Sequence, residues 1–141
     1  MRTLILLAAM LPLLAACGGA SAPGAGDLAT YSGQRLVINY WAQWCKPCIK
    51  EIPELNEFNE AHPDVQVLGV NYDGLLGEEL AAQEEALGIE FPTLLQDPAA
   101  ALGVPRPVVL PTTLIVDSSG KVLETLLGPQ TLESLESALG N

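Results

Sequence analysis

The chain has 141 residues, the length of a single domain of ordinary size. Because 49% of the residues are hydrophobic, the domain can build its own core and does not need a disulfide or a metal to hold it together. The formal net charge of −11, from 6 basic and 17 acidic residues, argues against nucleic acid as a partner, because Lys and Arg are needed to bind phosphates.

Residues 1–16 have the layout of a secretory signal. Met1-Arg2 is a short basic start, and the apolar run from Leu4 to Ala16 is too short for a permanent transmembrane helix. The run leads into the sequence LAAC, which resembles a bacterial lipobox. That resemblance implies cleavage before Cys17 and lipidation of Cys17, so that the protein faces the periplasm from a bacterial membrane. An ordinary signal peptide followed by an unrelated cysteine is the alternative.

Residues 17–27 then predict a lipidated cysteine and a flexible tether, and residues 28–141 predict one folded domain. The segment from Gly18 to Asp27 consists mostly of small residues and has no hydrophobic periodicity, which is typical of a linker.

The folded domain is predicted to be α/β. A buried strand is expected at Leu36–Trp41, where the residues are β-branched, aromatic and largely apolar, and a helix follows from about Pro47 to Ala61. On that helix Glu51, Glu54, Glu57 and Glu60 recur every third residue and predict a mostly solvated face. Further elements are expected as strands at 65–71, 91–95, 112–116 and 122–126, helices at 78–87 and after Thr131, and a turn or short helix at 97–102.

Cys45 and Cys48 allow three interpretations. With Cys17 assigned to lipidation they remain as a pair, which could be a structural bridge, part of a metal site or a redox-active dithiol. A zinc site is the weakest of these, because it needs about four ligands and the domain offers two cysteines and one histidine. A structural bridge over two residues would restrict the unfolded chain little.

The redox interpretation explains where the cysteines stand. The preceding strand brings Cys45 to the carboxyl edge of the sheet and to a helix N-terminus, where free N–H groups and the helix dipole stabilise a thiolate. Lys46 adds a positive charge, and Pro47 suits the first turn of a helix. Cys48, one turn further, is within reach of Cys45, so one thiolate could attack and the other resolve the mixed disulfide.

The residues LVINY followed by WAQWCKPC resemble the thioredoxin superfamily, whose motif is a strand followed by Trp-Ala-x-Trp-Cys-x-Pro-Cys. More narrowly, residues 28–139 are similar to the TlpA-like, DsbE-type membrane-tethered oxidoreductases. Asn39 stands where thioredoxin has a buried Asp, and Cys48 begins that branch's Cys-x-x-Glu-x-Pro motif. The resemblance implies a thioredoxin-like fold, a central mixed β-sheet with helices on both faces. It also implies Cys45 as the nucleophile, Cys48 as the resolving thiol, and no cofactor beyond this dithiol, with Trp44, Lys46 and Pro47 modulating it.

Two further site residues follow from the resemblance. Glu51 lies one turn past Cys48, so its carboxylate could oppose thiolate formation or relay protons; it could also be one more member of the solvated glutamate face. Pro111, in the sequence LPTT, matches a cis-proline loop that faces the dithiol and whose backbone would pair with a bound substrate strand.

The function implied is that of a lipid-anchored thiol–disulfide oxidoreductase, a monomeric reductase of protein disulfides that receives electrons from a membrane thiol–disulfide donor. Cytochrome c maturation is one pathway in which it could act. The segment Val104–Val109 weakens that assignment, because it is longer and more Pro-rich than the family's usual approach to the cis-proline. The alternatives are a disulfide oxidase, an isomerase, or a tethered binding module with an inert disulfide.

Overall fold

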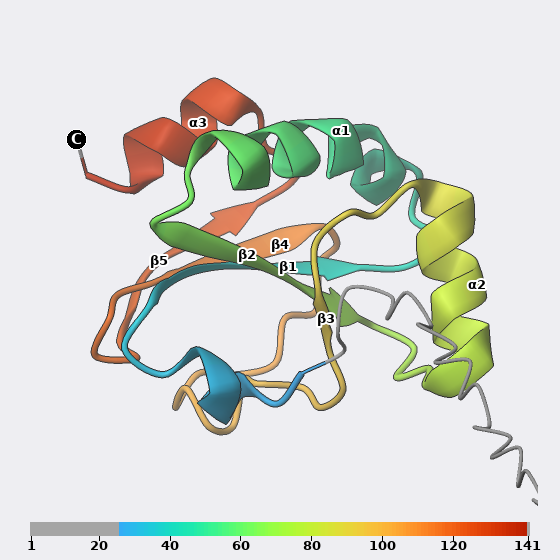
Figure 1. Cartoon of the computed structure of the whole chain (residues 1–141), viewed down its shortest axis with the longest axis horizontal. Coiled ribbons are helices and arrows are strands. Elements are labelled where there is room, and N and C mark those ends of the chain that lie inside the picture. Colours follow the sequence, from blue (N-terminus) through green and yellow to red (C-terminus); the bar gives the residue numbers. More distant parts are fainter. Residues whose placement is uncertain (1–25, 141) are drawn as a thin grey trace, which may run out of the picture.

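The computed structural model describes residues 26–140, so the expected signal, Cys17 and most of the expected tether lie outside the described residues. The elements within this range alternate between strand and helix until the last strand pair (Figure 1). In chain order they are η1 (Leu28–Tyr31, a 3-10 helix), β1 (Arg35–Trp41), α1 (Lys46–Ala61), β2 (Val65–Asn71), α2 (Gly77–Leu87), β3 (Thr93–Leu94), β4 (Thr112–Val116), β5 (Val122–Leu127) and α3 (Leu132–Ala138).

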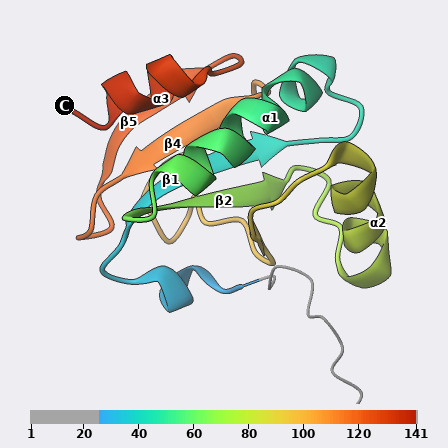
Figure 2. The same ribbon diagram turned by 45° about the horizontal axis from the view of Figure 1, so that its top comes forward.

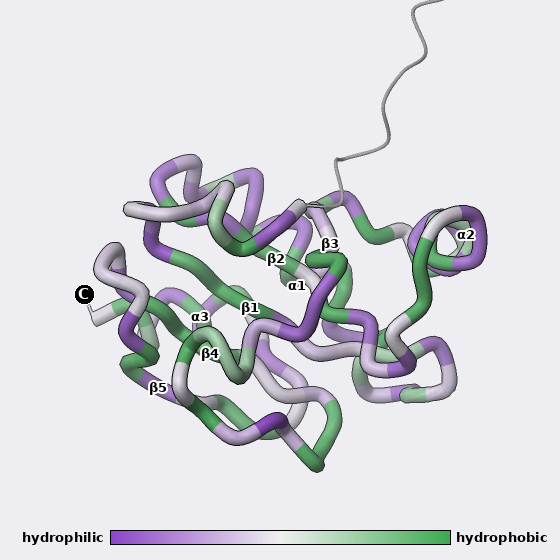
Figure 3. Tube along the Cα trace, turned by 90° about the horizontal axis from the view of Figure 1, so that it is seen from below, coloured by the Kyte–Doolittle hydropathy of each residue, from purple (hydrophilic) through white to green (hydrophobic). Residues whose placement is uncertain are grey.

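The strands form one mixed sheet in the order β3-β2-β1-β4-β5. β1 pairs in parallel with β2 and antiparallel with β4, and β5 returns antiparallel beside β4. β1 is therefore the central strand, and every residue of it except Arg35 is buried. Hydrophobic residues run along the middle of the sheet (Figure 3). The central mixed sheet that the sequence predicts is confirmed.

One segment differs from expectation, and another takes one of the two forms expected for it. The strand expected at 91–95 pairs only over Thr93–Leu94, because Pro92 has no N–H to donate to the sheet; its carbonyl oxygen accepts a hydrogen bond from the Gly69 N–H at 2.8 Å. The turn or short helix expected at 97–102 is a series of turns.

The two faces of the sheet are covered differently. α1 and α3 lie side by side over one face, where Val37 and Trp41 of β1 pack against Leu55 and Leu135 (Figures 1 and 2). The opposite face is covered by η1 and by the irregular segment between β3 and β4, so the only helix on it among residues 26–140 is a 3-10 helix. Burial on both faces explains why β1 is a nearly continuous apolar run. Among residues 26–140, no helix has the length and apolar character needed to cross a bilayer.

Candidate functional site

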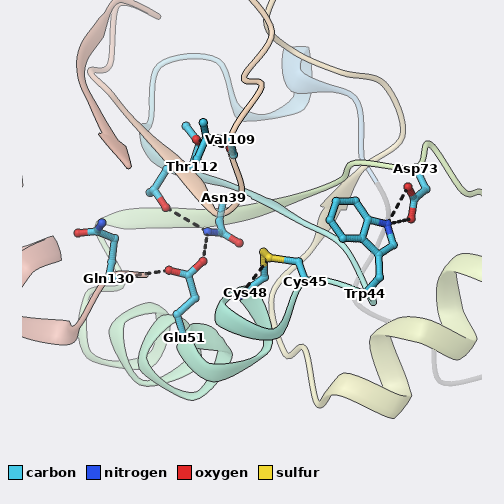
Figure 4. The surroundings of a disulfide bond; sticks show 10 residues. Asn39, Trp44, Cys45, Cys48, Glu51, Asp73, Val109, Thr112 and Gln130 are labelled. Carbon is cyan, nitrogen blue, oxygen red and sulfur yellow. Dashed lines mark hydrogen bonds between the residues drawn. A yellow bond between two sulfur atoms is a disulfide. The ribbon is translucent and has the colours of Figure 1, made fainter. Parts of the chain in front are cut away.

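Cys45 and Cys48 form a disulfide at the N-terminus of α1 (Figure 4). β1 ends at Trp41, and Cys45 is the residue that caps α1; its sulfur accepts a hydrogen bond of 3.3 Å from the Cys48 N–H. Pro47 occupies the first turn, where its missing N–H leaves no bond unmade. The fold thus places both sulfur atoms at the positive end of the α1 dipole, which favours a thiolate once the bond is reduced.

The two cysteines differ in their access to solvent. Both are nearly buried, with 4% of Cys45 and 1% of Cys48 exposed. Only Cys45 borders a hollow of about 460 Å³ at the edge of the sheet. We call this the dithiol hollow; its lining residues are Trp44, Cys45, Lys46, Pro47, Tyr72, Val108 and Leu110.

One wall of the dithiol hollow is built by the residues that follow β1 and β2, because the carboxyl ends of these parallel strands meet at the same edge. Trp44 is 63% exposed, and its indole N–H donates to both carboxylate oxygens of Asp73 at 3.1 and 3.0 Å (Figure 4). The Tyr72 ring meets the Trp44 ring edge to face, with centroids 6.5 Å apart. These contacts fix an aromatic surface beside Cys45.

Glu51 lies on the other side of the disulfide and is buried, unlike the solvated face expected for the glutamates of α1 (Figure 4). Its Oε1 accepts a hydrogen bond of 2.7 Å from the Asn39 side chain, and its Oε2 accepts one of 2.8 Å from the Gln130 N–H. Asn39 also donates to the Thr113 hydroxyl at 3.0 Å. The carboxylate therefore links α1 to β1 and to the residues that precede α3.

Burial raises the pKa of Glu51 to about 7. The hydrogen bonds from the Gln130 N–H and the Asn39 side chain act in the opposite direction, because they stabilise the charged form, but they offset only part of the desolvation. A carboxyl group with this pKa exchanges its proton near neutral pH, and it stands one turn past Cys48 on the same helix.

Pro111 is buried and follows a cis peptide bond from Leu110, as the sequence predicts. Its carbonyl oxygen accepts a hydrogen bond of 2.9 Å from the Gly128 N–H. Leu110, the residue before it, lines the dithiol hollow together with Cys45. The cis-proline loop and the disulfide thus belong to one site. Cys17 lies outside the described residues.

Sequence reasoning did not assign a site role to Asn39 and did not identify Gln130 or Arg106. Asn39 carried a usable signal, because it is a polar residue inside an otherwise apolar strand. Arg106 carried one too, as the only charged residue in the Pro-rich stretch from Val104 to Val109. Gln130 carried none, because it acts through its backbone N–H.

Arg106 belongs to a polar cluster at the edge of the site. Asp97 accepts hydrogen bonds from the Tyr40 hydroxyl at 2.7 Å, the Ala99 N–H at 2.9 Å and the Arg106 Nε at 2.7 Å. Burial opposes the ionisation of Asp97, but these hydrogen bonds outweigh it and hold its pKa below the usual value. Within residues 26–140, no group of three or more His, Cys, Asp or Glu side chains is arranged to hold a metal ion.

Comparisons with known proteins point to thiol–disulfide chemistry. Residues 20–125 match the AhpC/TSA family. The thiol-disulfide oxidoreductase ResA of Bacillus thuringiensis (strain Al Hakam) is 33% identical over 117 residues, which are 80% of this chain; the chain spans 66% of that protein's length. Similar solved structures include StoA from Bacillus subtilis, with a TM-score of 0.63 and 27% identity over 77% of this chain and 84% of that one. Another is a secreted thiol-disulfide isomerase from Corynebacterium glutamicum, with a TM-score of 0.65 and 27% identity over 79% of this chain and 71% of that one.

Proposed function

Because the chain belongs to the AhpC/TSA family, we propose that it is a thiol–disulfide oxidoreductase whose reacting groups are Cys45 and Cys48. One observation carries the proposal: the disulfide sits at a helix N-terminus, and only Cys45 of the pair borders an open hollow. A purely structural bridge would not need either feature. The curated relative ResA and the solved structure from Corynebacterium glutamicum carry names of thiol–disulfide enzymes.

The reaction begins from the reduced dithiol. The Cys45 thiolate attacks one sulfur of a substrate disulfide, so that a Cys45–substrate bond forms and the second substrate sulfur leaves as a thiolate and takes up a proton. The Cys48 thiolate then attacks the Cys45 sulfur and releases the other substrate sulfur, which is also protonated. Two electrons pass to the substrate, and the enzyme is left with the Cys45–Cys48 disulfide that the structure contains.

Glu51 is proposed to take the proton that Cys48 loses. Cys48 is buried, so it must give up its proton inside the protein. Glu51 lies one turn away on α1, and its pKa of about 7 lets it accept a proton and release it again near neutral pH. Lys46, at the first position of α1, is proposed to favour the Cys45 thiolate.

The direction and location of the activity are part of the proposal. The enzyme is a reductase of protein disulfides at the periplasmic side of a bacterial membrane, held there by lipid on Cys17. A membrane dithiol donor returns two electrons after each cycle. The Pro111 carbonyl is already bonded to Gly128, so the backbone of Leu110 is the edge that remains for a substrate strand. Cytochrome c maturation is one pathway that could supply such substrates.

A redox titration tests this function. The purified domain is equilibrated with mixtures of reduced and oxidised glutathione, and its free thiols are counted after an acid quench. A redox-active dithiol passes reversibly from two free thiols to none across the series. A bridge that stays oxidised throughout would be an inert disulfide, and the domain would then be a binding module.

The order of the two cysteines is tested by trapping. Cys48→Ser should accumulate mixed disulfides with a substrate protein through Cys45, because the resolving thiol is absent. Cys45→Ser is the matched control and should accumulate far fewer. Adducts on Cys48 alone would reverse the proposed order.

A further inference from the structure

A second hollow adjoins the site and plays no part in the exchange reaction itself. It has a volume of about 380 Å³ and lies on the sheet face opposite α1. We call it the β4–β5 hollow; residues that line it include Val108, Val109, Thr112, Leu114, Thr125 and Leu127. Val108 lines both hollows, so a polypeptide that reaches Cys45 through the dithiol hollow can continue directly into the β4–β5 hollow.

Aliphatic side chains are unusually exposed along this path. Val108 is 89% exposed, Leu127 66% and Val109 50%. Exposed apolar side chains that gather beside a site usually mark a surface that binds an apolar partner, because covering them removes apolar area from water. The hollow adjoins the dithiol hollow at Val108, so the occupant that fits it is the same polypeptide that carries the substrate disulfide.

Arg106 fixes the chain that carries these valines. Its guanidinium Nη2 donates to the Tyr72 carbonyl oxygen at 2.7 Å, its Nε donates to Asp97 at 2.7 Å, and its Cζ lies 3.9 Å from the centre of the Tyr72 ring. The Tyr72 hydroxyl donates to the Pro107 carbonyl oxygen at 3.1 Å. Tyr72 therefore holds Arg106 through its carbonyl oxygen and its ring, and it holds Pro107 through its hydroxyl group.

The other end of the segment is held as well. The Thr112 hydroxyl donates to the Val109 carbonyl oxygen at 2.7 Å, and both residues are drawn in Figure 4. Val108 thus lies between two fixed points, and its side chain stays extended toward solvent. Only a planar guanidinium can bond a carboxylate and a carbonyl and stack on a ring at the same time, so Lys could not replace all these contacts.

We propose that Arg106 is a positioning residue that holds Val108 and Val109 as a wall beside Cys45, and that this wall selects disulfides in extended polypeptide segments with aliphatic or aromatic flanking residues. The proposal rests on the thiol–disulfide exchange proposed above, since it names the substrate class of that same site. Small disulfides carry no flanking residues that the wall could select.

The test compares three disulfides on the pre-reduced protein. Two are peptide disulfides that differ only in the residues flanking the cysteine, which are Val and Leu in one and Ser and Asn in the other; the third is bis(2-hydroxyethyl) disulfide. Second-order rate constants are measured by the change in Trp fluorescence. Wild type should react about fivefold faster with the apolar peptide than with the polar one, as expected when part of an aliphatic side chain is buried.

Arg106→Met and Val108→Ser should both bring that ratio close to one. The rate toward bis(2-hydroxyethyl) disulfide, which has no flanking residues, reports any general change in the reactivity of Cys45 in each variant. Arg106→Lys should give an intermediate ratio. Val108 is on the surface, so Val108→Ser tests the wall even if Arg106→Met loosens the fold. Leu123→Ser is the matched control, because Leu123 is 53% exposed on β5 and lines neither hollow; it should keep the wild-type ratio.

A ratio is measured within one protein, so a general loss of stability does not move it. Equal rates for the two peptides in wild type would overturn the selectivity, and an unchanged ratio in Arg106→Met would overturn the role of Arg106. In both cases the exchange reaction itself would still stand. Absence of reaction with all three disulfides would instead overturn the proposed function, and this inference with it.

Discussion

At the scale of single residues, the site contains two carboxylates whose surroundings differ. Asp73 is exposed and holds the Trp44 indole, whereas Glu51 is buried with hydrogen bonds to both oxygens. Three helical turns of glutamates on α1 look alike in sequence, and only Glu51 is fully buried. Its partners come from β1 and from the chain before α3, so the spacing of the glutamates does not distinguish it from Glu57 or Glu60; only the Cys-x-x-Glu-x-Pro motif does.

The raised pKa of Glu51 predicts a specific dependence of stability on pH. Between its ordinary value of 4.5 and about 7 the folded protein holds a proton that the unfolded chain has lost. The contribution is therefore complete below about pH 4.5 and disappears as the pH rises through 7, amounting to about 3 kcal/mol at 1.36 kcal/mol per pKa unit.

Glu51→Gln cannot titrate, so the difference in unfolding free energy between wild type and this variant should shift by about 3 kcal/mol in favour of the variant from pH 4.5 to 7.5. Urea unfolding of the oxidised proteins across that range measures it. Glu57 is exposed on α1, so the unfolding free energy of Glu57→Gln should depend on pH in the same way as that of wild type. Parallel curves for wild type and Glu51→Gln would show that Glu51 is ionised in the folded protein throughout.

Lys46 gives a second prediction at this scale. It is an exposed residue between the cysteines, at the start of α1. Lys46→Gln removes a positive charge next to the Cys45 thiolate, so the pKa of the reduced Cys45 should rise. The rate of iodoacetamide alkylation against pH measures it, with Lys50→Gln one turn further along as the control. Identical profiles for wild type and Lys46→Gln would mean that Lys46 does not contribute to the Cys45 pKa.

At the scale of elements, β2 depends on a residue with no side chain. A Cβ on Gly69 would lie 2.8 Å from Trp41 Nε1, 2.9 Å from Thr93 Oγ1 and 3.3 Å from the Phe91 ring. Trp41 Nε1 and Thr93 Oγ1 are buried, and neither has a hydrogen-bond partner within residues 26–140. Trp41 at the end of β1 and the segment with Phe91 and Thr93 at β3 therefore meet over β2 at Gly69, where no side chain stands between them.

Gly69→Ala should lower the free energy of unfolding by about 1–3 kcal/mol, because the methyl group has to displace Trp41 or Thr93 in a closely packed core. Thermal and urea unfolding of the oxidised protein measure this change. The loss should persist after reduction, since Gly69 does not line the dithiol hollow. Unchanged stability would show that β3 moves away from β2 at little cost.

The sequence predicted the elements well where one strong local signal acts: the apolar run of β1, the three-residue spacing of α1 and the turn of the β4–β5 hairpin. It predicted Cys45, Cys48 and the cis Pro111 because short motifs carry them. It did not predict the Glu51–Asn39–Gln130 contacts or the contacts of Arg106, because these join residues that are 9 to 79 positions apart and depend on which segments become neighbours. The strand predicted at 91–95 was longer than β3, because strand propensity alone takes no account of Pro92, which has no N–H to donate to the sheet.

At the scale of the whole molecule, the described chain begins at one edge of the sheet and the apolar path lies toward the other. Gly26 is bonded to the β3 edge through Leu95, whose N–H donates to the Gly26 carbonyl oxygen at 3.2 Å. The β4–β5 hollow is at the opposite edge of the five strands. A chain that comes from a lipid anchor at Cys17 would therefore join the domain at the β3 edge, away from the path proposed for the substrate.

This arrangement predicts that anchoring and exchange are separable. Cys17→Ser should abolish incorporation of labelled palmitate when the full chain is expressed in a bacterium that processes lipoproteins, because the acylated thiol is missing. The purified variant should reduce a soluble peptide disulfide at the same rate as the domain from residue 26 onward, since the tether enters at the β3 edge. Cys45→Ser is the control for labelling and should incorporate palmitate like wild type. Labelling that persists in Cys17→Ser would contradict the lipoprotein assignment, whereas a slower exchange rate would mean that the segment before Gly26 contributes to the site.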